Sequence, residues 1–184
     1  MRAERLLEEF EVQFDVCAYD LRPGIPPEGL PRAQASAGHT YPAGYLENLR
    51  QTALSSGIDM KRPPVIPNTR KAHEATEFAR EAGCLLPFHR AVFQAYWEDE
   101  RDIGDVDALC EIAGACGLDA GALRQALAQG RYSERVQEQM DWSRDVGVSG
   151  VPTFIFEEKF AVVGAQDYAV LRDVASRVAS GRVA

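Results

Sequence analysis

The chain has 184 residues, and its 28 acidic and 20 basic side chains give a formal net charge of −8 at pH 7. With 46% hydrophobic and 26% charged residues it has the composition of a globular protein, which excludes collagen-like, coiled-coil and low-complexity chains. The acidic balance, without a cluster of Lys and Arg, argues against nucleic acid and anionic membrane surfaces as partners.

The N-terminal part predicts a helix over residues 2–9 and then a strand over residues 12–21. The strand is indicated by a period of two, because apolar or small side chains at 12, 14, 16 and 18 alternate with their neighbours. Residues 22–31 are rich in proline, which cannot donate a backbone hydrogen bond. We expect this segment to be an exit loop without regular backbone pairing.

From residue 41 to residue 146 the apolar period is that of helices. A second proline-rich break, at 62–67, precedes a helix predicted to begin with Asn68 as its N-cap and to end before Gly83. Asp105 and Asp119 are further predicted N-caps. The whole block is therefore predicted to be helical.

After Gly147 the period returns to that of strands. Residues 153–156 and 159–163, joined by a polar turn at Glu157 and Glu158, predict a short antiparallel hairpin. Asp167 is the predicted N-cap of a last amphipathic helix that reaches residue 179. The predicted order is helix, strand, helical block, two strands, helix.

Neither the cysteines nor the histidines form a ligand or redox pattern. The cysteines at 17, 84, 110 and 116 show no Cys-x-x-Cys spacing, and the histidines at 39, 73 and 89 are far apart, so no metal site and no resident cofactor are expected. We expect Cys17 to be buried within its strand and Cys84 to be the most exposed thiol. With no apolar run of signal-peptide or membrane-span length, we expect a cytoplasmic protein.

The segment Gly147-Val-Ser-Gly-Val-Pro-Thr-Phe154 carries the sharpest local signal. Pro152 stands at the start of a strand, where proline is tolerated and where an X-Pro bond can be cis. A cis bond turns the amide and carbonyl of Val151 outward, where they can pair with an extended peptide or a glutathione backbone. The alternative is that Pro152 begins an edge strand in the trans form. We predict the cis bond.

Together these motifs resemble the DsbA-type thiol-disulfide oxidoreductases and, within them, the FrnE-like branch. The resemblance covers nearly the whole chain and rests on Gly147-Val-Ser-Gly-Val-Pro-Thr-Phe-Ile-Phe156, Asn68-Thr-Arg-Lys-Ala72, Phe88-His89 with the helix that contains Tyr96, and the loop at 22–29. It implies an α/β protein with a thioredoxin-like fold and an inserted all-helical domain. The implied domains are residues 1–38 with 147–184, and residues 39–146.

Family members carry a Cys-x-x-Cys pair at the start of the first helix, just after the first strand, and the resemblance places both upstream of residue 1. The expected fold thus lacks its N-terminal first strand, so the open sheet edges must close on each other, borrow a strand from a second copy, or self-associate. No cysteine occupies the redox position, and no catalytic residue is predicted. We expect an impaired DsbA/FrnE-like oxidoreductase whose thiol or disulfide substrates dock against Val151 and Pro152.

Two alternatives stay open. Kappa-class glutathione transferases and 2-hydroxychromene-2-carboxylate isomerases share the inserted helical architecture, and they hold glutathione through the residue before the cis-proline and residues after the last strand. The matching positions here are Val151, Gln166 and Asp167, although helix capping also accounts for Asp167. The other alternative is a non-catalytic peptide-binding module. The sequence leaves a homodimer open in each case.

Overall fold

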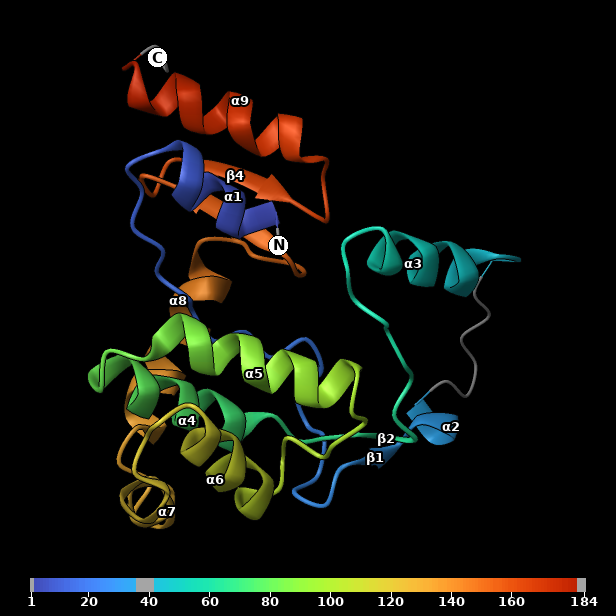
Figure 1. Ribbon diagram of the computed structural model, residues 1–184, viewed down its shortest axis with the longest axis vertical. Helices are drawn as coiled ribbons and strands as arrows, with labels where there is room; N and C mark the ends of the chain where they lie inside the picture. The colour runs from blue at the N-terminus through green and yellow to red at the C-terminus, as the bar shows by residue number, and fades with distance from the viewer. Residues whose placement is uncertain (1, 36–41, 182–184) are drawn as a thin grey trace. The chain divides into compact units, whose positions relative to one another are not determined.

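The computed structural model describes residues 2–35 and 42–181 (Figure 1). The chain forms two compact units, one made of Met1–Leu21 with Gln139–Ala184 and the other of Arg22–Glu138. We name the first the sheet unit and the second the helical unit. The domain bounds predicted from the sequence, 1–38 with 147–184 and 39–146, stay a prediction.

The sheet unit contains the hairpin and two helices, α1 (Arg2–Glu9) and α9 (Tyr168–Ala179). Strands β3 (Thr153–Phe156) and β4 (Phe160–Val163) pair antiparallel, with Thr153 opposite Val163. Leu6 of α1 and Leu171 of α9 lie in one buried cluster with Val162. The predicted helices and hairpin are confirmed, because their apolar residues share one core.

The turn of this hairpin is the polar one that the sequence predicts. The Lys159 N–H donates to the Phe156 carbonyl at 3.0 Å, which closes a four-residue turn. Its two central residues have positive φ, 49° at Glu157 and 54° at Glu158. Two positive φ values are typical of a type I′ turn, whose twist matches that of the strands that it joins.

The strand predicted over residues 12–21 is wrong, because within the described residues this segment forms no hydrogen-bonded strand. The period of two is nevertheless real: Val12 and Phe14 pack against the core, while the odd-numbered positions 11 to 17 are exposed. Side chains of helix α8 (Ser133–Asp145) form hydrogen bonds with the end of the segment instead. Ala18 N–H donates to Gln139 Oε1 at 2.8 Å, and Ser143 Oγ donates to the Ala18 carbonyl at 3.4 Å.

Cys17 follows the same alternation and lies on the outward side of this segment. The prediction that Cys17 is buried is therefore wrong. Its neighbour Ala18 takes the buried position, at 5% exposure. A strand-like pattern fixes which side chains are covered, but it does not supply a partner for the backbone.

The helical unit has its core between α4 (Arg70–Glu81), α5 (Leu85–Trp97), α6 (Val106–Ala115) and α7 (Ala120–Ala128). The first part of α8, up to Glu138, also belongs to this unit. Phe88, Leu109 and Leu123 are fully buried in that core. Asp105 and Asp119 cap α6 and α7 through their carboxylates, as predicted. The predicted helical character of this block is confirmed for these elements, and α4, α5 and α6 lie close together in Figure 1.

Helix α4 begins one residue later than predicted. Thr69 is its N-cap residue, and Asn68 Oδ1 accepts a hydrogen bond from the Arg70 N–H at 3.0 Å. The same Asn68 side chain donates through Nδ2 to the Ile25 carbonyl at 2.6 Å. Asn68 therefore joins the start of α4 to the proline-rich loop at 22–29.

The two proline-rich segments pair with each other, so the prediction that residues 22–31 form a loop without regular backbone pairing is wrong. Strand β1 (Leu30–Pro31) is antiparallel to β2 (Val65–Ile66), followed by the short helix α2 (Arg32–Ala35). Proline loses its donor but keeps its carbonyl, and the Arg32 N–H donates to the Pro64 carbonyl at 2.7 Å. Helix α3 (Tyr45–Leu54), which lies between α2 and β2 in the sequence, has no buried residue.

Candidate functional site

The loop that leads into β3 is fixed on both sides of Val151. The Val151–Pro152 peptide bond is cis. Thr153 Oγ1 donates to the Gly150 carbonyl at 2.7 Å. The Gly164 N–H donates to the Pro152 carbonyl at 2.8 Å, which extends the β3–β4 pairing by one bond. The positions before and after Val151 thus have their carbonyls occupied.

Val151 itself presents a donor and an acceptor. Its N–H and its carbonyl find no hydrogen-bond partner among the described residues, and the residue is 53% exposed. An exposed amide and carbonyl at the end of a strand can pair with the backbone of an extended ligand. The loop can therefore bind a ligand through backbone hydrogen bonds at Val151.

Gln166 and Asp167 lie after β4, close to the same end of the hairpin. The Gln166 N–H donates to the carbonyl of Gly164, the residue that bonds Pro152, and Gln166 Nε2 donates to the Val163 carbonyl at 3.0 Å. Asp167 is the N-cap residue of α9, but its side chain accepts no hydrogen bond from the helix amides. The antiparallel pairing of β3 with β4 thus places Val151 and Pro152, before β3, near Gln166 and Asp167, after β4.

Two of the four thiols, those of Cys110 and Cys116, are in surroundings unsuited to nucleophilic exchange. Burial raises the pKa of the Cys110 thiol. Burial, and then the nearby Cys84, raise the pKa of Cys116. Cys84 is half-buried, with Sγ 3.6 Å from the Cys116 carbonyl oxygen that accepts its hydrogen bond. Exchange requires a thiolate, so the environments of Cys110 and Cys116 disfavour the reactive form.

The two histidines that the structure describes, His73 and His89, contact different side chains. Burial lowers the pKa of His89, whose ring lies 4.7 Å from that of Phe93. His73 Nε2 is 3.4 Å from Thr69 Oγ1, and His39 lies outside the described residues. Within the described ranges, no group of three or more His, Cys, Asp or Glu residues could hold a metal ion. No helix in that part of the chain is long and apolar enough to cross a bilayer.

The decisive comparison is with sequence families. Residues 1–175 match the DSBA-like thioredoxin domain. The chain belongs to this family. The thioredoxin-like fold with a helical insertion, which the sequence predicted, is that of the DSBA-like family, and the recognition of a DsbA-type protein is confirmed.

Two solved structures and one relative are similar to this DSBA-like chain. The crystal structure of the probable DsbA oxidoreductase SCO1869 from Streptomyces coelicolor is 24% identical with a TM-score of 0.88, over 100% of this chain and 84% of that one. A 2-hydroxychromene-2-carboxylate isomerase is 20% identical with a TM-score of 0.74, over 98% and 88%. The uncharacterized protein YwbO from Bacillus subtilis strain 168 is 26% identical over 155 residues, 83% of this chain and 76% of YwbO.

The sequence motif leads directly to Val151 and Pro152, but it misses the α8 side chains that bond Ala18. Gln139 and Ser143 are polar residues of an amphipathic helix, spaced four apart on one face, and both reach the same backbone. That spacing is the only sequence signal for them. It does not identify a target about 120 residues away in this DSBA-like chain.

Proposed function

We propose that this DSBA-like protein binds the extended backbone of a thiol- or disulfide-containing substrate at Val151. In this proposal it is a DsbA/FrnE-like thiol-disulfide oxidoreductase whose exchange chemistry is impaired. The single observation that supports it is the exposed Val151, whose N–H and carbonyl find no partner in the described part of the chain.

The chemistry explains the expected impairment. In exchange, a thiolate attacks one sulfur of a disulfide, a new S–S bond forms, and the other sulfur leaves as a thiolate. A second nearby thiol then resolves the mixed disulfide. The sequence has no Cys-x-x-Cys pair, and burial raises the pKa of Cys110 and Cys116. Substrate docking is therefore proposed to be better preserved than catalysis.

Glutathione is the second candidate ligand, on a separate observation. The exposed Asp167 carboxylate stands at the start of α9, directly after β4, where it would accept a charge-assisted hydrogen bond from the ammonium group of glutathione. Gln166 lies beside it at the same end of β4. The cytoplasmic location expected from the sequence is retained as a proposal, and the homodimer stays open. A protein that binds peptides without catalysing any reaction is the third candidate.

Titration of the ¹⁵N-labelled protein with two ligands tests the docking site. The ligands are S-methylglutathione and a hexapeptide with an S-methylated cysteine at its centre. We expect amide shifts at Val151 and Thr153. Val151→Pro removes the amide donor and should weaken binding about tenfold, while Val151→Ala keeps the donor and should change it less than about twofold. Unchanged binding by a folded Val151→Pro variant would refute docking at this amide.

Asp167→Asn separates the two ligands. It should weaken binding of S-methylglutathione and leave the hexapeptide unaffected if Asp167 holds an ammonium group. If the variant and the wild type bind both ligands equally well, Asp167 is not part of the site.

Insulin reduction tests the expected impairment. The purified chain should show only slow exchange by an ordinary thiol of pKa about 8.5. Turnover comparable to that of a Cys-x-x-Cys family member would contradict it. Replacing the exposed Cys17 and then Cys84 by Ala would identify the thiol responsible.

A further inference from the structure

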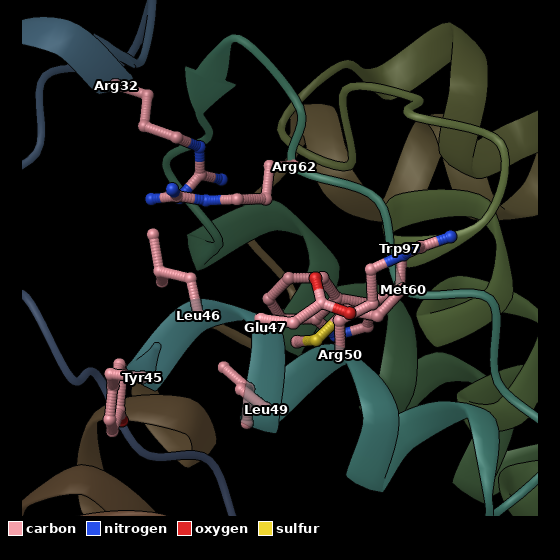
Figure 2. Close-up of a pocket in the computed structure, with 9 residues that line it drawn as sticks. All are labelled: Arg32, Tyr45, Leu46, Glu47, Leu49, Arg50, Met60, Arg62 and Trp97. Carbon is pink, nitrogen blue, oxygen red and sulfur yellow. The ribbon is translucent and has the colours of Figure 1, made fainter. Parts of the chain in front are cut away.

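A pocket of about 370 Å³ lies within the helical unit, and its walls do not include the β3–β4 hairpin. Figure 2 shows its lining side chains, which come from four separate segments of the sequence. Arg32 begins α2, Arg50 and Leu49 belong to α3, and Met60, Arg62 and Trp97 complete the wall. The pairing of β1 with β2 brings the segments of Arg32 and Arg62 together.

The charges of this pocket are unbalanced, although the chain as a whole carries −8. Three arginines line it, Arg32, Arg50 and Arg62, against one carboxylate, that of Glu47. Arg50 has a weak exposed partner, Asp59, at 3.8 Å. Glu47 accepts a hydrogen bond from Gln51 Nε2 at 2.7 Å. The pocket therefore has an excess of positive charge.

Arg32 and Arg62 have no carboxylate partner among the described residues. Arg32 Nε donates to the Pro63 carbonyl at 2.6 Å, and its Nη2 donates to the Tyr96 hydroxyl at 2.9 Å, so both acceptors are neutral. The bond to Pro63 holds this guanidinium beside Arg62, and Figure 2 shows the two side chains extending toward each other. A guanidinium has further N–H donors, which match the two oxygens of an anion.

The rest of the wall is apolar. Leu49 is 41% exposed and Tyr45 is 46% exposed. Both belong to α3, which has no buried residue. Met60 and Trp97 are half-buried on the opposite wall. Apolar side chains beside guanidinium groups that have no carboxylate partner suit a ligand with an apolar body and an anionic end.

We propose that this pocket binds a small amphipathic carboxylate. The carboxylate lies against Arg32 and Arg62, and the aliphatic or aromatic body lies against Leu49, Met60 and Trp97. Because two hydrogen bonds already hold Arg32 in place, little side-chain entropy is lost there on binding. The site is independent of the function proposed for Val151.

Octanoate is the probe for this site, and Trp97 is the reporter. The chain has two tryptophans, so a Trp142→Phe background leaves Trp97 as the single tryptophan. We expect octanoate to change its fluorescence and to release or absorb heat in calorimetry with a one-to-one stoichiometry. Octan-1-ol lacks the charge, whereas acetate and inorganic phosphate lack the apolar body. Each of these three should bind at least about tenfold more weakly than octanoate, because each lacks either the anionic group or the apolar chain that the pocket is proposed to bind.

Arg62→Gln and Lys61→Gln form a matched pair of variants. Both side chains are exposed and both changes remove one positive charge, but only Arg62 lines the pocket. Arg62→Gln should weaken octanoate binding about tenfold and Lys61→Gln less than about twofold. Equal losses, no octanoate binding, or binding of octan-1-ol or phosphate as tight as that of octanoate would overturn the proposal.

Discussion

Glu77 and Arg135 form an ion pair of 2.7 Å in which the carboxylate side chain is only 1% exposed and the arginine side chain is 53% exposed. Arg80 approaches the same carboxylate at 3.1 Å. Glu77 lies on α4 and Arg135 in the first turn of α8, so the pair fixes these two helices of the helical unit to each other. A carboxylate this deeply buried needs such partners, because desolvation otherwise disfavours its charge.

Glu77→Ala should lower the free energy of unfolding by about 3 kcal/mol, because it leaves two guanidinium groups beside an emptied, water-poor position. Arg135→Ala should lower it by only about 1 kcal/mol, because Arg80 still faces the carboxylate. Urea unfolding measures both. Glu111→Ala is the control, because its pair with Arg101 has a carboxylate that is 71% exposed and should be worth less than about 1 kcal/mol. Equal losses in Glu77→Ala and Glu111→Ala would contradict the structural role of Glu77.

Gly29→Ala should be more destabilising than Gly24→Ala. Both glycines have positive φ, 82° and 95°, so each alanine should cost about 1 kcal/mol in backbone conformation. Around Gly24 nothing lies within 4 Å of a Cβ, whereas at Gly29 a Cβ would be 2.7 Å from Val65 Cγ1 and 3.0 Å from the Ile66 carbonyl oxygen. We expect Gly29→Ala to lose at least about 1 kcal/mol more, measured by urea unfolding of the two variants.

The sequence predicts the helices and the hairpin well, because their periodicity and caps are local. The prediction from sequence fails where the structure depends on contacts between segments that are far apart in the chain. The strand predicted around Val12 and Phe14 has the expected burial, but a strand also requires a backbone partner, which periodicity cannot reveal. Arg32 and Arg62 are 30 positions apart, each next to a proline-rich segment, and only the pairing of β1 with β2 makes them neighbours. Glu77 looks like an ordinary solvated helix residue until its burial is known.

The stability of the protein should depend on His89 in mildly acidic solution. Burial holds the folded-state pKa of His89 below its ordinary value of 6.5, so the unfolded chain takes up this proton more readily. Stability contributed by neutral His89 is therefore present above about pH 6.5 and is lost as the pH falls below it. His89→Phe should be less sensitive than the wild type between about pH 7 and pH 5. An NMR titration in which the His89 ring has a pKa at or above 6.5 would refute this.

The turn at Glu157 and Glu158 has a consequence for engineering a more robust form of the protein. Both residues have positive φ, a conformation that Asn and Gly adopt at far lower cost than Glu, and both are exposed. Replacing them by Asn and Gly should raise the free energy of unfolding by about 1 kcal/mol and also remove two adjacent like charges. Thermal unfolding of the double variant checks this, and an unchanged midpoint would show that the turn is not strained. Neither substitution changes the core, Val151 or the pocket lined by Arg32 and Arg62. The tip of this hairpin is therefore a position where the protein can be stabilised without altering either proposed binding site.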